Sequence, residues 1–155
     1  MLMSITYTKA KLTDIKAMQA MVLPEVMSGV ILFRSDDEVA NNIRSYTLAK
    51  DDDKVIGFVA LHIHAADLAE VRSLIVDDAY RGKKIGAALV KHTITEANEL
   101  GIEQLFTLTY QKAFFEKLHF NEIPKESLPE HKIWADCVKC KHFPICDEIA
   151  LIIKP

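Results

Sequence analysis

Two kinds of hydrophobic spacing follow one another at the start of the chain. Residues 4–9 alternate weakly between polar and apolar side chains, which predicts a strand. After Thr13 and Asp14, a suitable helix start, apolar residues recur at the spacing of one helix face: Ile15, Met18 and Met21 or Val22. Pro24 should break or kink this helix, because proline lacks the amide hydrogen that a helix interior uses.

A second helix and a hairpin are expected next. Residues 35–38, Ser-Asp-Asp-Glu, have the capping-box spacing, so a short helix should cover residues 36–44. Two runs rich in β-forming residues, 46–49 and 55–63, flank an acidic turn at residues 51–54. Such a turn between two runs predicts a β-hairpin.

The middle of the chain has the pattern of a strand, a glycine-containing loop and a helix. A polar break at residues 64–67 separates the hairpin from a strand at 68–76. The loop at residues 81–86 leads into a helix whose apolar residues share one face: Leu89, Val90, Ile94 and Ala97. Gly101 is a natural left-handed terminator for that helix.

The last elements complete an α/β pattern. A strand at residues 104–109 follows the helical crossover, which predicts pairing with the strand at 68–76. A short helix at residues 113–118 and a final strand at 148–153 come after it. We expect a single domain over residues 1–155, with a mixed twisted central sheet of about six to seven strands flanked by helices.

Composition excludes several classes of protein. The chain has 155 residues, of which 50% are hydrophobic and 26% charged, the balance of one ordinary globular domain. Its 19 Lys and Arg against 22 Asp and Glu give a net charge of -3, without the positive excess of proteins that bind nucleic acid through phosphates. No apolar run reaches the roughly 20 residues of a membrane span, and no apolar centre of a secretion signal is present. A cytoplasmic protein that binds neither nucleic acid nor membranes is expected.

Residues 81–87 carry the clearest binding signal in the chain. A helix begins there, and its first backbone amides are unpaired and carry a partial positive charge. Gly82 and Gly86 would let a phosphate approach those amides. Three cations surround the two glycines: Arg81, Lys83 and Lys84. A pyrophosphate is therefore the best candidate ligand, and a basic helix cap with glycine for tight packing is the alternative.

Together with its neighbours, this loop resembles the acetyl-CoA-binding motif of the GCN5-related N-acetyltransferase (GNAT) superfamily. The segments that carry the resemblance are VRSLIVD at residues 71–77, YRGKKIGAAL at 80–89 and AFFEKLHF at 113–120. The loop of that family has the form Q/R-x-x-G-x-G/A. Arg81 and Gly86 fit this form, whereas Lys84 stands at its first glycine, where it needs a tolerable backbone conformation.

The resemblance implies the GNAT fold and acetyl-CoA as the cosubstrate. The strands at 68–76 and 104–109 should splay apart to admit the thioester. Backbone amides of about residues 83–87 should hold the CoA pyrophosphate, while residues 74–76 bond the pantetheine arm as another strand would. The expected cofactor-binding residues are Leu74, Ile75, Val76, Arg81, Gly82, Lys83, Lys84, Ile85, Gly86, Ala87, Thr109, Phe114 and Phe115.

The resemblance extends to the short, single-domain N-acetylglutamate synthases. The similar segments are LFRS at residues 32–35, GFVALH at 57–62, AEVRSL at 69–74, FTLTY at 106–110 and FFEK at 114–117. They imply acetyl transfer to the α-amine of a small amino acid, L-glutamate above all, in arginine biosynthesis. The alternatives are a GNAT enzyme for another small amine or a protein N-terminus, and a non-catalytic CoA-binding regulatory module. A homodimer is compatible with the sequence.

A dicarboxylic acceptor needs at least two positive or strongly donating groups. The candidates in the similar segments are Arg34, His62 and Arg72. Arg34 has an alternative role as a surface residue, and His62 as a hydrogen-bonded strand residue. Arg72 has an alternative role as an ion-pair partner of Glu70 or Asp77. Because alternate residues of a strand share a face, Glu70 and Arg72 can line the same cleft.

Direct attack of the amine on the thioester in a ternary complex is the expected mechanism. Glu70, directly or through water, is the candidate to accept the amine proton, with an ion pair to Arg72 as its alternative role. Backbone amides near a strand bulge would stabilise the oxyanion. Many GNAT enzymes protonate the CoA thiolate with a tyrosine, but Phe115 stands at that position. Tyr110 is the nearest substitute, with simple packing, or protonation by solvent, as the alternatives.

Three cysteines lie towards the C-terminal end: Cys137, Cys140 and Cys146. C-x-x-C can form half of a zinc site, but the usual second pair is absent. Reduced cysteines that pack together or line the acceptor pocket are the preferred interpretation. Structural zinc and regulated oxidation are the alternatives, and no metal is assigned.

Overall fold

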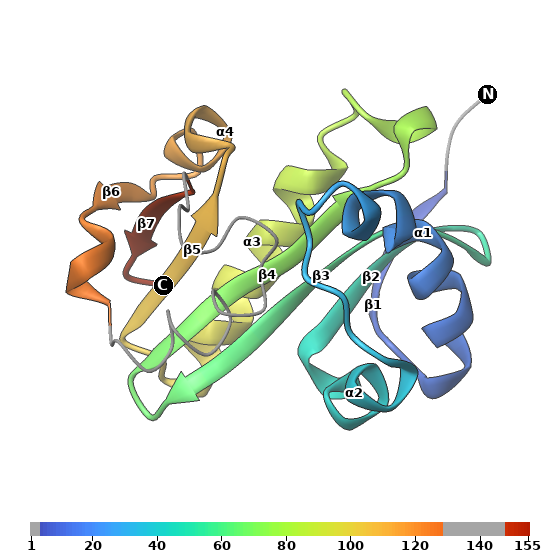
Figure 1. Cartoon of the computed structure of the whole chain (residues 1–155), viewed down its shortest axis with the longest axis horizontal. Coiled ribbons are helices and arrows are strands. Elements are labelled where there is room, and N and C mark those ends of the chain that lie inside the picture. Colours follow the sequence, from blue (N-terminus) through green and yellow to red (C-terminus); the bar gives the residue numbers. More distant parts are fainter. Residues whose placement is uncertain (1–3, 129–147) are drawn as a thin grey trace.

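The computed structural model describes residues 4–128 and 148–155. Its centre is a seven-stranded sheet in the order β1-β2-β3-β4-β5-β7-β6 (Figure 1). The strands are β1 (Ile5–Lys9), β2 (Tyr46–Asp51), β3 (Lys54–Ala65), β4 (Leu68–Val76), β5 (Gln104–Thr109), β6 (Asn121–Ile123) and β7 (Ile149–Ile153). Neighbouring strands are antiparallel except for the parallel pair β4 and β5. The mixed sheet confirms the expected fold class.

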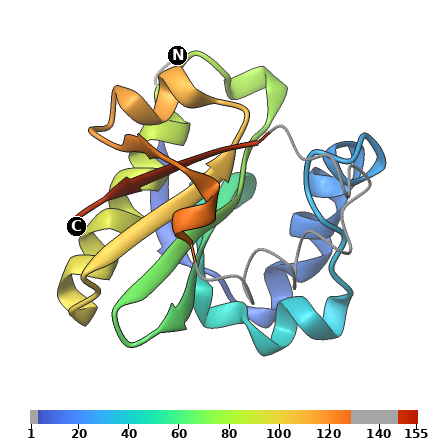
Figure 2. The same ribbon diagram turned by 60° about the vertical axis from the view of Figure 1, so that its left-hand side comes forward.

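Helices cover both faces of this sheet. In the described part of the chain the α-helices are α1 (Ile15–Met27), α2 (Asp36–Asn41), α3 (Ile85–Leu100) and α4 (Lys112–Glu116). Short 3-10 turns lie at Leu12–Asp14, Ile43–Ser45, Asp78–Tyr80 and Lys125–Ser127. Figure 2 shows α3 on one side of the sheet and α1 and α2 on the other.

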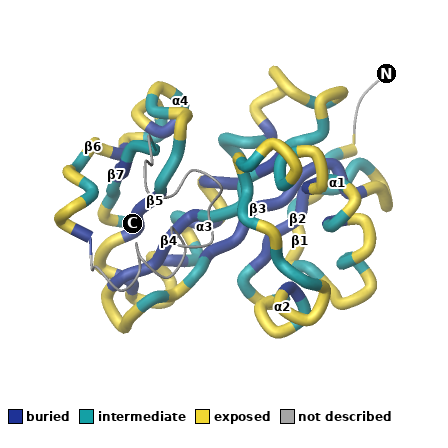
Figure 3. The backbone as a smooth tube through the Cα atoms, in the orientation of Figure 1, coloured by how far each residue is buried: buried dark blue, intermediate teal, exposed yellow. Residues whose placement is uncertain are grey.

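Successive residues of β3 contribute to two separate hydrophobic cores, because side chains alternate across a strand. Val59 packs with Leu89 in the core beneath α3. Phe58 points the other way and packs with Met18 in the core beneath α1. The central strands are therefore buried on both faces over much of their length, as Figure 3 shows, and they provide a rigid support for the site.

The first helix passes through its proline. Pro24 lies inside α1, which continues to Met27, so the proline does not break the helix. Only one amide hydrogen is missing from the helix ladder. The carbonyl oxygen of Pro24 accepts a hydrogen bond from the Ser28 amide at 3.1 Å, so regular bonding resumes within one turn.

The second helix is capped as expected but is shorter. The Glu38 amide donates to the Ser35 hydroxyl at 3.2 Å, and the Ser35 amide donates to the Glu38 carboxylate at 3.5 Å. This confirms the capping box. The helix ends at Asn41 rather than at residue 44, because the chain tightens there into the 3-10 turn Ile43–Ser45.

The expected hairpin is formed by β2 and β3, with Asp52 in the left-handed region (φ 53°) at its turn. Its second strand is longer than predicted, since β3 includes His64 and ends at Ala65. The predicted polar break at residues 64–67 is therefore wrong in its first two positions. The reason is that the His64 side chain is only 1% exposed and pairs with a carboxylate inside the molecule. His64 thus behaves as an interior residue and not as a turn residue.

The two parallel strands separate after a short paired stretch. Residues Leu68–Glu70 of β4 pair with Gln104–Phe106 of β5, and beyond them the strands diverge (Figure 1). Where the ladder ends, the Thr107 hydroxyl donates to the Val71 carbonyl oxygen at 3.1 Å. This side-chain bond closes the apex of a V-shaped opening, and it confirms the expected splay.

Candidate active site

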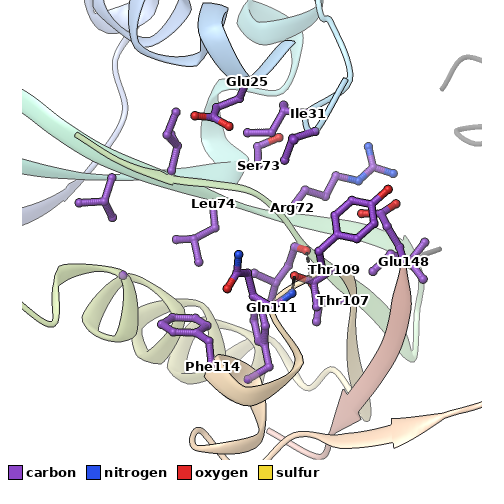
Figure 4. Close-up of a pocket in the computed structure, with 18 of the residues that line it drawn as sticks. Glu25, Ile31, Arg72, Ser73, Leu74, Thr107, Thr109, Gln111, Phe114 and Glu148 are labelled. Carbon is purple, nitrogen blue, oxygen red and sulfur yellow. Dashed lines mark hydrogen bonds between the residues drawn. The ribbon is translucent and has the colours of Figure 1, made fainter. Parts of the chain in front are cut away.

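A cleft of about 1730 Å³ occupies the opening between β4 and β5 (Figure 4). Its walls come from the loop after α1, from β4, from the start of α3, from the end of β5 and from α4. Sites for one drug-sized ligand enclose about 300–1000 Å³. The cleft is therefore large enough for a long cosubstrate and a small acceptor together.

A β-bulge shapes the β4 wall of the cleft. Phe58 of β3 faces Ile75, but Ala60 faces Arg72, so β4 carries one extra residue in between. Within this bulge Ser73 has a φ of 55°, in the left-handed region. A bulge takes backbone groups out of the strand ladder and re-aims them. Ser73 and Leu74 both line the cleft, so this irregular backbone lies where an oxyanion or a pantetheine amide would need partners.

The loop before α3 presents the helix start to the cleft. Lys84 lies immediately before the helix with φ 64° and ψ 18°, a left-handed conformation in which glycine is the usual residue. This explains why the family's motif has glycine there, and it shows that Lys84 adopts the required conformation. The next residue, Ile85, is buried and anchors the helix start in the core. The unpaired amides of the first turn can therefore bind an anion.

Gly86 leaves space in the cleft because it has no side chain. A Cβ atom at this position would lie 3.5 Å from Cζ of Phe114 and 3.7 Å from Cγ2 of Val76, which is ordinary contact. All three residues line the cleft. Leu74 and Phe114 lie on opposite sides of the cleft in Figure 4, and both line it together with Gly86, so this part of the cleft is an apolar passage between β4 and α4.

Arg81 is engaged by carboxylates at the mouth of the cleft. Its Nη2 lies 3.0 Å from Oδ1 of Asp78 and 3.8 Å from Oε1 of Glu25, and its Nε donates to the Val76 carbonyl oxygen at 3.3 Å. The side chain is 59% exposed, which weakens these ion pairs through solvent screening. Arg81 thus links α1 to the loop before α3.

A buried ionic cluster lies at the inner end of the cleft. Oε1 of Glu70 lies 2.7 Å from Nε2 of His64 and accepts a hydrogen bond from Nε of Arg72 at 3.0 Å. Burial raises the pKa of Glu70, but the hydrogen bond from His64 and the charge of Arg72 together outweigh burial and leave the pKa below its usual value. Glu70 is therefore ionised at neutral pH, and the predicted ion pair with Arg72 is present.

Two arginines line the cleft. Arg34 comes from the loop after α1 and Arg72 from β4. Burial raises the pKa of the Tyr46 phenol, and the charges of Arg34 and Arg72 oppose that rise. Two separate elements thus supply cations to the same cleft.

The aromatic residues after β5 differ in whether they have a proton to donate. Phe115 is 3% exposed and packs edge-to-face on Phe120, with the ring centroids 5.2 Å apart. It lines the cleft only as a hydrophobic surface. Tyr110 also lines the cleft, is 42% exposed and carries a hydroxyl, which Phe115 lacks.

Two predicted site residues do not line the cleft. Lys83 is exposed outside it, and His62 packs edge-to-face on the His64 ring at 4.5 Å. The other predicted residues do line it: Arg34, Glu70, Arg72, Leu74, Ile75, Val76, Arg81, Gly82, Lys84, Ile85, Gly86, Ala87, Thr109, Tyr110, Phe114 and Phe115.

Sequence reasoning missed several residues that shape the site. His64 was placed in a turn, although its spacing of two from His62 was a signal that both lie on one face of a strand. Other missed residues that line the cleft include Glu25, Ser73, Thr107, Gln111 and Glu148. A serine in a strand gives no sign of a bulge, so Ser73 had no signal of its own.

Metal and membrane chemistry find no support in the residues that the structure describes. Among residues 4–128 and 148–155, no three His, Cys, Asp or Glu side chains are arranged to hold a metal ion. No helix in these ranges has the length and apolar character needed to cross a bilayer. Cys137, Cys140 and Cys146 lie outside the described residues, so their role stays a prediction.

Comparison with known proteins identifies the class to which this fold and cleft belong. The sequence profile of the Acetyltransferase (GNAT) family matches residues 17–120, and the chain belongs to this family. It is an acetyl-CoA-dependent N-acetyltransferase. An uncharacterized N-acetyltransferase of Chlorobaculum tepidum is 36% identical over 92% of both chains.

More distant relatives have narrower descriptions. An amino-acid acetyltransferase of Mycobacterium tuberculosis is 31% identical over 74% of this chain and 67% of its own. The Vibrio cholerae amino-acid acetyltransferase is 29% identical over 80% of this chain, which spans only 28% of that longer protein. Among solved structures, N-acetylglutamate synthase from Neisseria gonorrhoeae, in complex with coenzyme A and N-acetyl-glutamate, has a TM-score of 0.84 at 23% identity. That match covers 99% of this chain and 36% of the synthase.

Proposed function

We propose that this enzyme transfers the acetyl group of acetyl-CoA to the α-amine of a small amino acid, and that L-glutamate, in arginine biosynthesis, is that amino acid. The observation that supports the proposal is that Arg34 and Arg72 line one cleft together with Glu70, which pairs with Arg72. Two cations suit an acceptor with two carboxylates. The amino-acid acetyltransferases among its relatives support the same acceptor class.

The cosubstrate is expected to enter from the α3 side of the cleft. Backbone amides of residues 83–87 would bind the pyrophosphate at the helix start, where an anion is stabilised by unpaired amides and the helix dipole. The pantetheine arm would then run along residues 74–76 and above Gly86. This route brings the thioester to the bulge at Ser73, where re-aimed backbone groups would stabilise the oxyanion.

Proton transfer accompanies each step of the reaction. The amine must lose a proton to become nucleophilic, and Glu70, which lines the cleft as a carboxylate, accepts it directly or through water. The amine nitrogen then bonds to the thioester carbonyl carbon, and the carbon–sulfur bond breaks. The nitrogen, now positively charged, releases its second proton to solvent and becomes the amide. CoA leaves as a thiolate, which takes a proton from solvent or from Tyr110, itself then reprotonated by solvent, because Phe115 has none to give. Holding both reactants in one cleft supplies much of the rate.

Measurement of CoA thiol release tests the acceptor directly. With acetyl-CoA and a panel of L-glutamate, L-glutamine, L-aspartate and a short peptide, we expect glutamate to give the highest kcat/KM. Arg34→Ala should raise the KM for glutamate roughly ten- to a hundredfold, as expected for loss of a charged hydrogen bond. Arg44→Ala is the matched control, because Arg44 is exposed and does not line the cleft.

The other outcomes separate the competing functions. Faster release with the peptide or another amine would leave the acetyltransferase activity and overturn glutamate as the acceptor. Tight binding of CoA without release for any amine would favour a non-catalytic CoA-binding module. An equal effect of Arg34→Ala and Arg44→Ala on KM would remove Arg34 from the acceptor site.

A further inference from the structure

His64 is buried and only half satisfied. Its side chain is 1% exposed, and its ring stacks on buried Phe106 with the centroids 5.5 Å apart. Nε2 lies 2.7 Å from Oε1 of Glu70, while Nδ1 is buried with no hydrogen-bond partner in the described part of the chain. A buried polar atom without a partner is destabilising, so its presence in a folded protein needs a physical explanation.

The partner of the ring defines which nitrogen donates. The carboxylate of Glu70 can only accept a hydrogen bond, so Nε2 must carry a hydrogen and donate it. Nδ1 takes no part in this contact.

Donors from two strands hold the same oxygen of Glu70. His64 comes from β3 and Arg72 from β4, and both engage Oε1. Oε2 accepts no hydrogen bond from the described residues, although Glu70 lines the cleft. The clamp on Oε1 thus fixes the side-chain rotamer and leaves Oε2 as the oxygen for a ligand.

Other titratable groups come from the sheet and from the lining of the cleft. His62 lies opposite Glu70 in the strand register but packs on the His64 ring. From β5, the residue paired with Glu70 is the apolar Phe106. The phenol of Tyr46 interacts with the charge of Arg72. The remaining groups line the cleft: Glu25, Arg34, Glu38, Tyr80, Arg81, Lys84, Tyr110, Lys117 and Glu148.

We infer that His64 is a positioning residue for acetyl transfer: by donating from Nε2 to Oε1, it holds Glu70 with Oε2 directed at the acceptor amine. This inference rests on the proposed role of Glu70 as the proton acceptor. His64 touches neither reactant and acts through Glu70. The unpaired Nδ1 is the cost of placing an imidazole donor behind the carboxylate in the interior.

Two substitutions of His64 separate positioning from packing. His64→Leu removes the donor, and His64→Gln keeps an N–H donor at a similar reach. His64→Leu should lower kcat about tenfold or more with the KM for acetyl-CoA nearly unchanged. The acidic limb of the kcat/KM profile, measured with the preferred amino acid, should move about one unit to higher pH, because Glu70 loses a bond that favours its ionised form. His64→Gln should restore most of kcat and should return the acidic limb close to its original pH.

The controls distinguish failure of this inference from failure of the proposed function. His92→Leu, on the exposed side of α3, should leave kcat and the pH profile unchanged. Glu70→Gln should abolish most of the activity. A fully active Glu70→Gln would overturn both the role of Glu70 and that of His64. An inactive Glu70→Gln beside a His64→Leu with the normal rate and pH limb would overturn the His64 inference alone.

A measurement on the unaltered protein covers the case in which His64→Leu does not fold. The ¹⁵N spectrum of the imidazoles should show that His64 carries a hydrogen on Nε2. A ring whose only hydrogen is on Nδ1 cannot donate to Glu70 from Nε2, and that result would overturn the inference.

Discussion

Lys84 takes a backbone conformation that lysine rarely adopts, and the enzyme retains the resulting strain. At φ 64° a side chain with a Cβ costs roughly 1–2 kcal/mol relative to the right-handed region. Lys84→Gly would remove this cost but would also increase the freedom of the unfolded chain, which opposes about half of the gain. We expect a net stabilisation of about 0.5–1 kcal/mol in the free energy of unfolding, measured in urea.

The neighbouring lysine provides a matched control for that prediction. Lys83→Gly removes the same charge from the same loop, but Lys83 is not in the left-handed region. It should therefore give no stabilisation. Equal stabilisation by both changes would show that relief of charge repulsion, and not backbone strain, is responsible.

Glu70 should make the stability of the protein depend on pH in the acidic range. Its pKa is below the value of 4.5 expected for the unfolded chain: burial raises it, but His64 and Arg72 lower it further. The stabilisation is therefore complete above pH 4.5 and is lost as the pH falls through the lower, folded-state pKa. Urea unfolding of Glu70→Gln should show a slope with pH that is shallower by up to about 1.4 kcal/mol per unit in that window. If Glu70→Gln and the unaltered protein showed the same slope with pH, the hydrogen bonds from His64 and Arg72 would not stabilise the Glu70 carboxylate.

At the scale of the elements, Gly57 allows two strands and a helix to pack closely. A Cβ on this β3 residue would lie 2.9 Å from the Ile75 carbonyl oxygen and 3.3 Å from Cδ1 of Leu89. The first contact is with backbone next to the bulge, which cannot move aside without disturbing the cleft. Gly57→Ala should therefore lower the free energy of unfolding by about 1–3 kcal/mol. A loss below a few tenths of a kcal/mol would mean that the sheet gives way easily at this point.

Gly86 should respond in the opposite way, since its surroundings have room for a side chain. A Cβ there makes only ordinary contacts with Phe114 and Val76, and replacing glycine within a helix favours folding slightly. Gly86→Val should leave stability nearly unchanged. Its methyl groups would, however, fill the apolar passage used by the pantetheine arm. We expect calorimetry to show at least about a tenfold loss of acetyl-CoA affinity, roughly the effect of one well-packed side chain. Unchanged affinity would contradict the proposed path of the cosubstrate.

The sequence predicts those elements in which local pattern and tertiary packing agree. The strand β5 has its expected bounds, and α3 ends before Gly101 (φ 82°) as expected. The strand β6 escapes prediction because Asn121–Ile123 is too short to show alternation. The extension of β3 is not predictable from the pattern, because histidine is a polar residue and His64 lies in the interior only through its pairing with Glu70.

The candidate site was predictable to different degrees at its two ends. The anion site at the helix start is predictable from Gly82, Gly86 and the neighbouring cations, since these residues are close together in the sequence. The acceptor end is assembled from residues far apart in the chain, such as Arg34 and Glu70, and only the family resemblance pointed to them. The bulge at Ser73 depends on how β4 meets β3, which no local pattern encodes.

At the scale of the whole molecule, the cleft divides the sheet into two parts that a bound cosubstrate would join. Strands β4 and β5 pair only near the apex, over Leu68–Glu70 and Gln104–Phe106, and the Thr107 hydroxyl bond to Val71 ends that contact. Walls of the cleft come from both parts, so a ligand between them contacts α3 and β4 on one side and β5 and α4 on the other. The open form should therefore gain stability when acetyl-CoA binds.

Thermal unfolding measures that gain and locates its source. Acetyl-CoA at a hundredfold its Kd should add about 2.7 kcal/mol to the free energy of unfolding. For a chain of this length the midpoint should rise by roughly 5–10 °C. Acetyl-pantetheine, which lacks the pyrophosphate, should raise the midpoint far less at the same concentration, because it cannot use the amides of residues 83–87. An equal rise with both compounds would place the binding energy along β4 and remove the α3 start from the site.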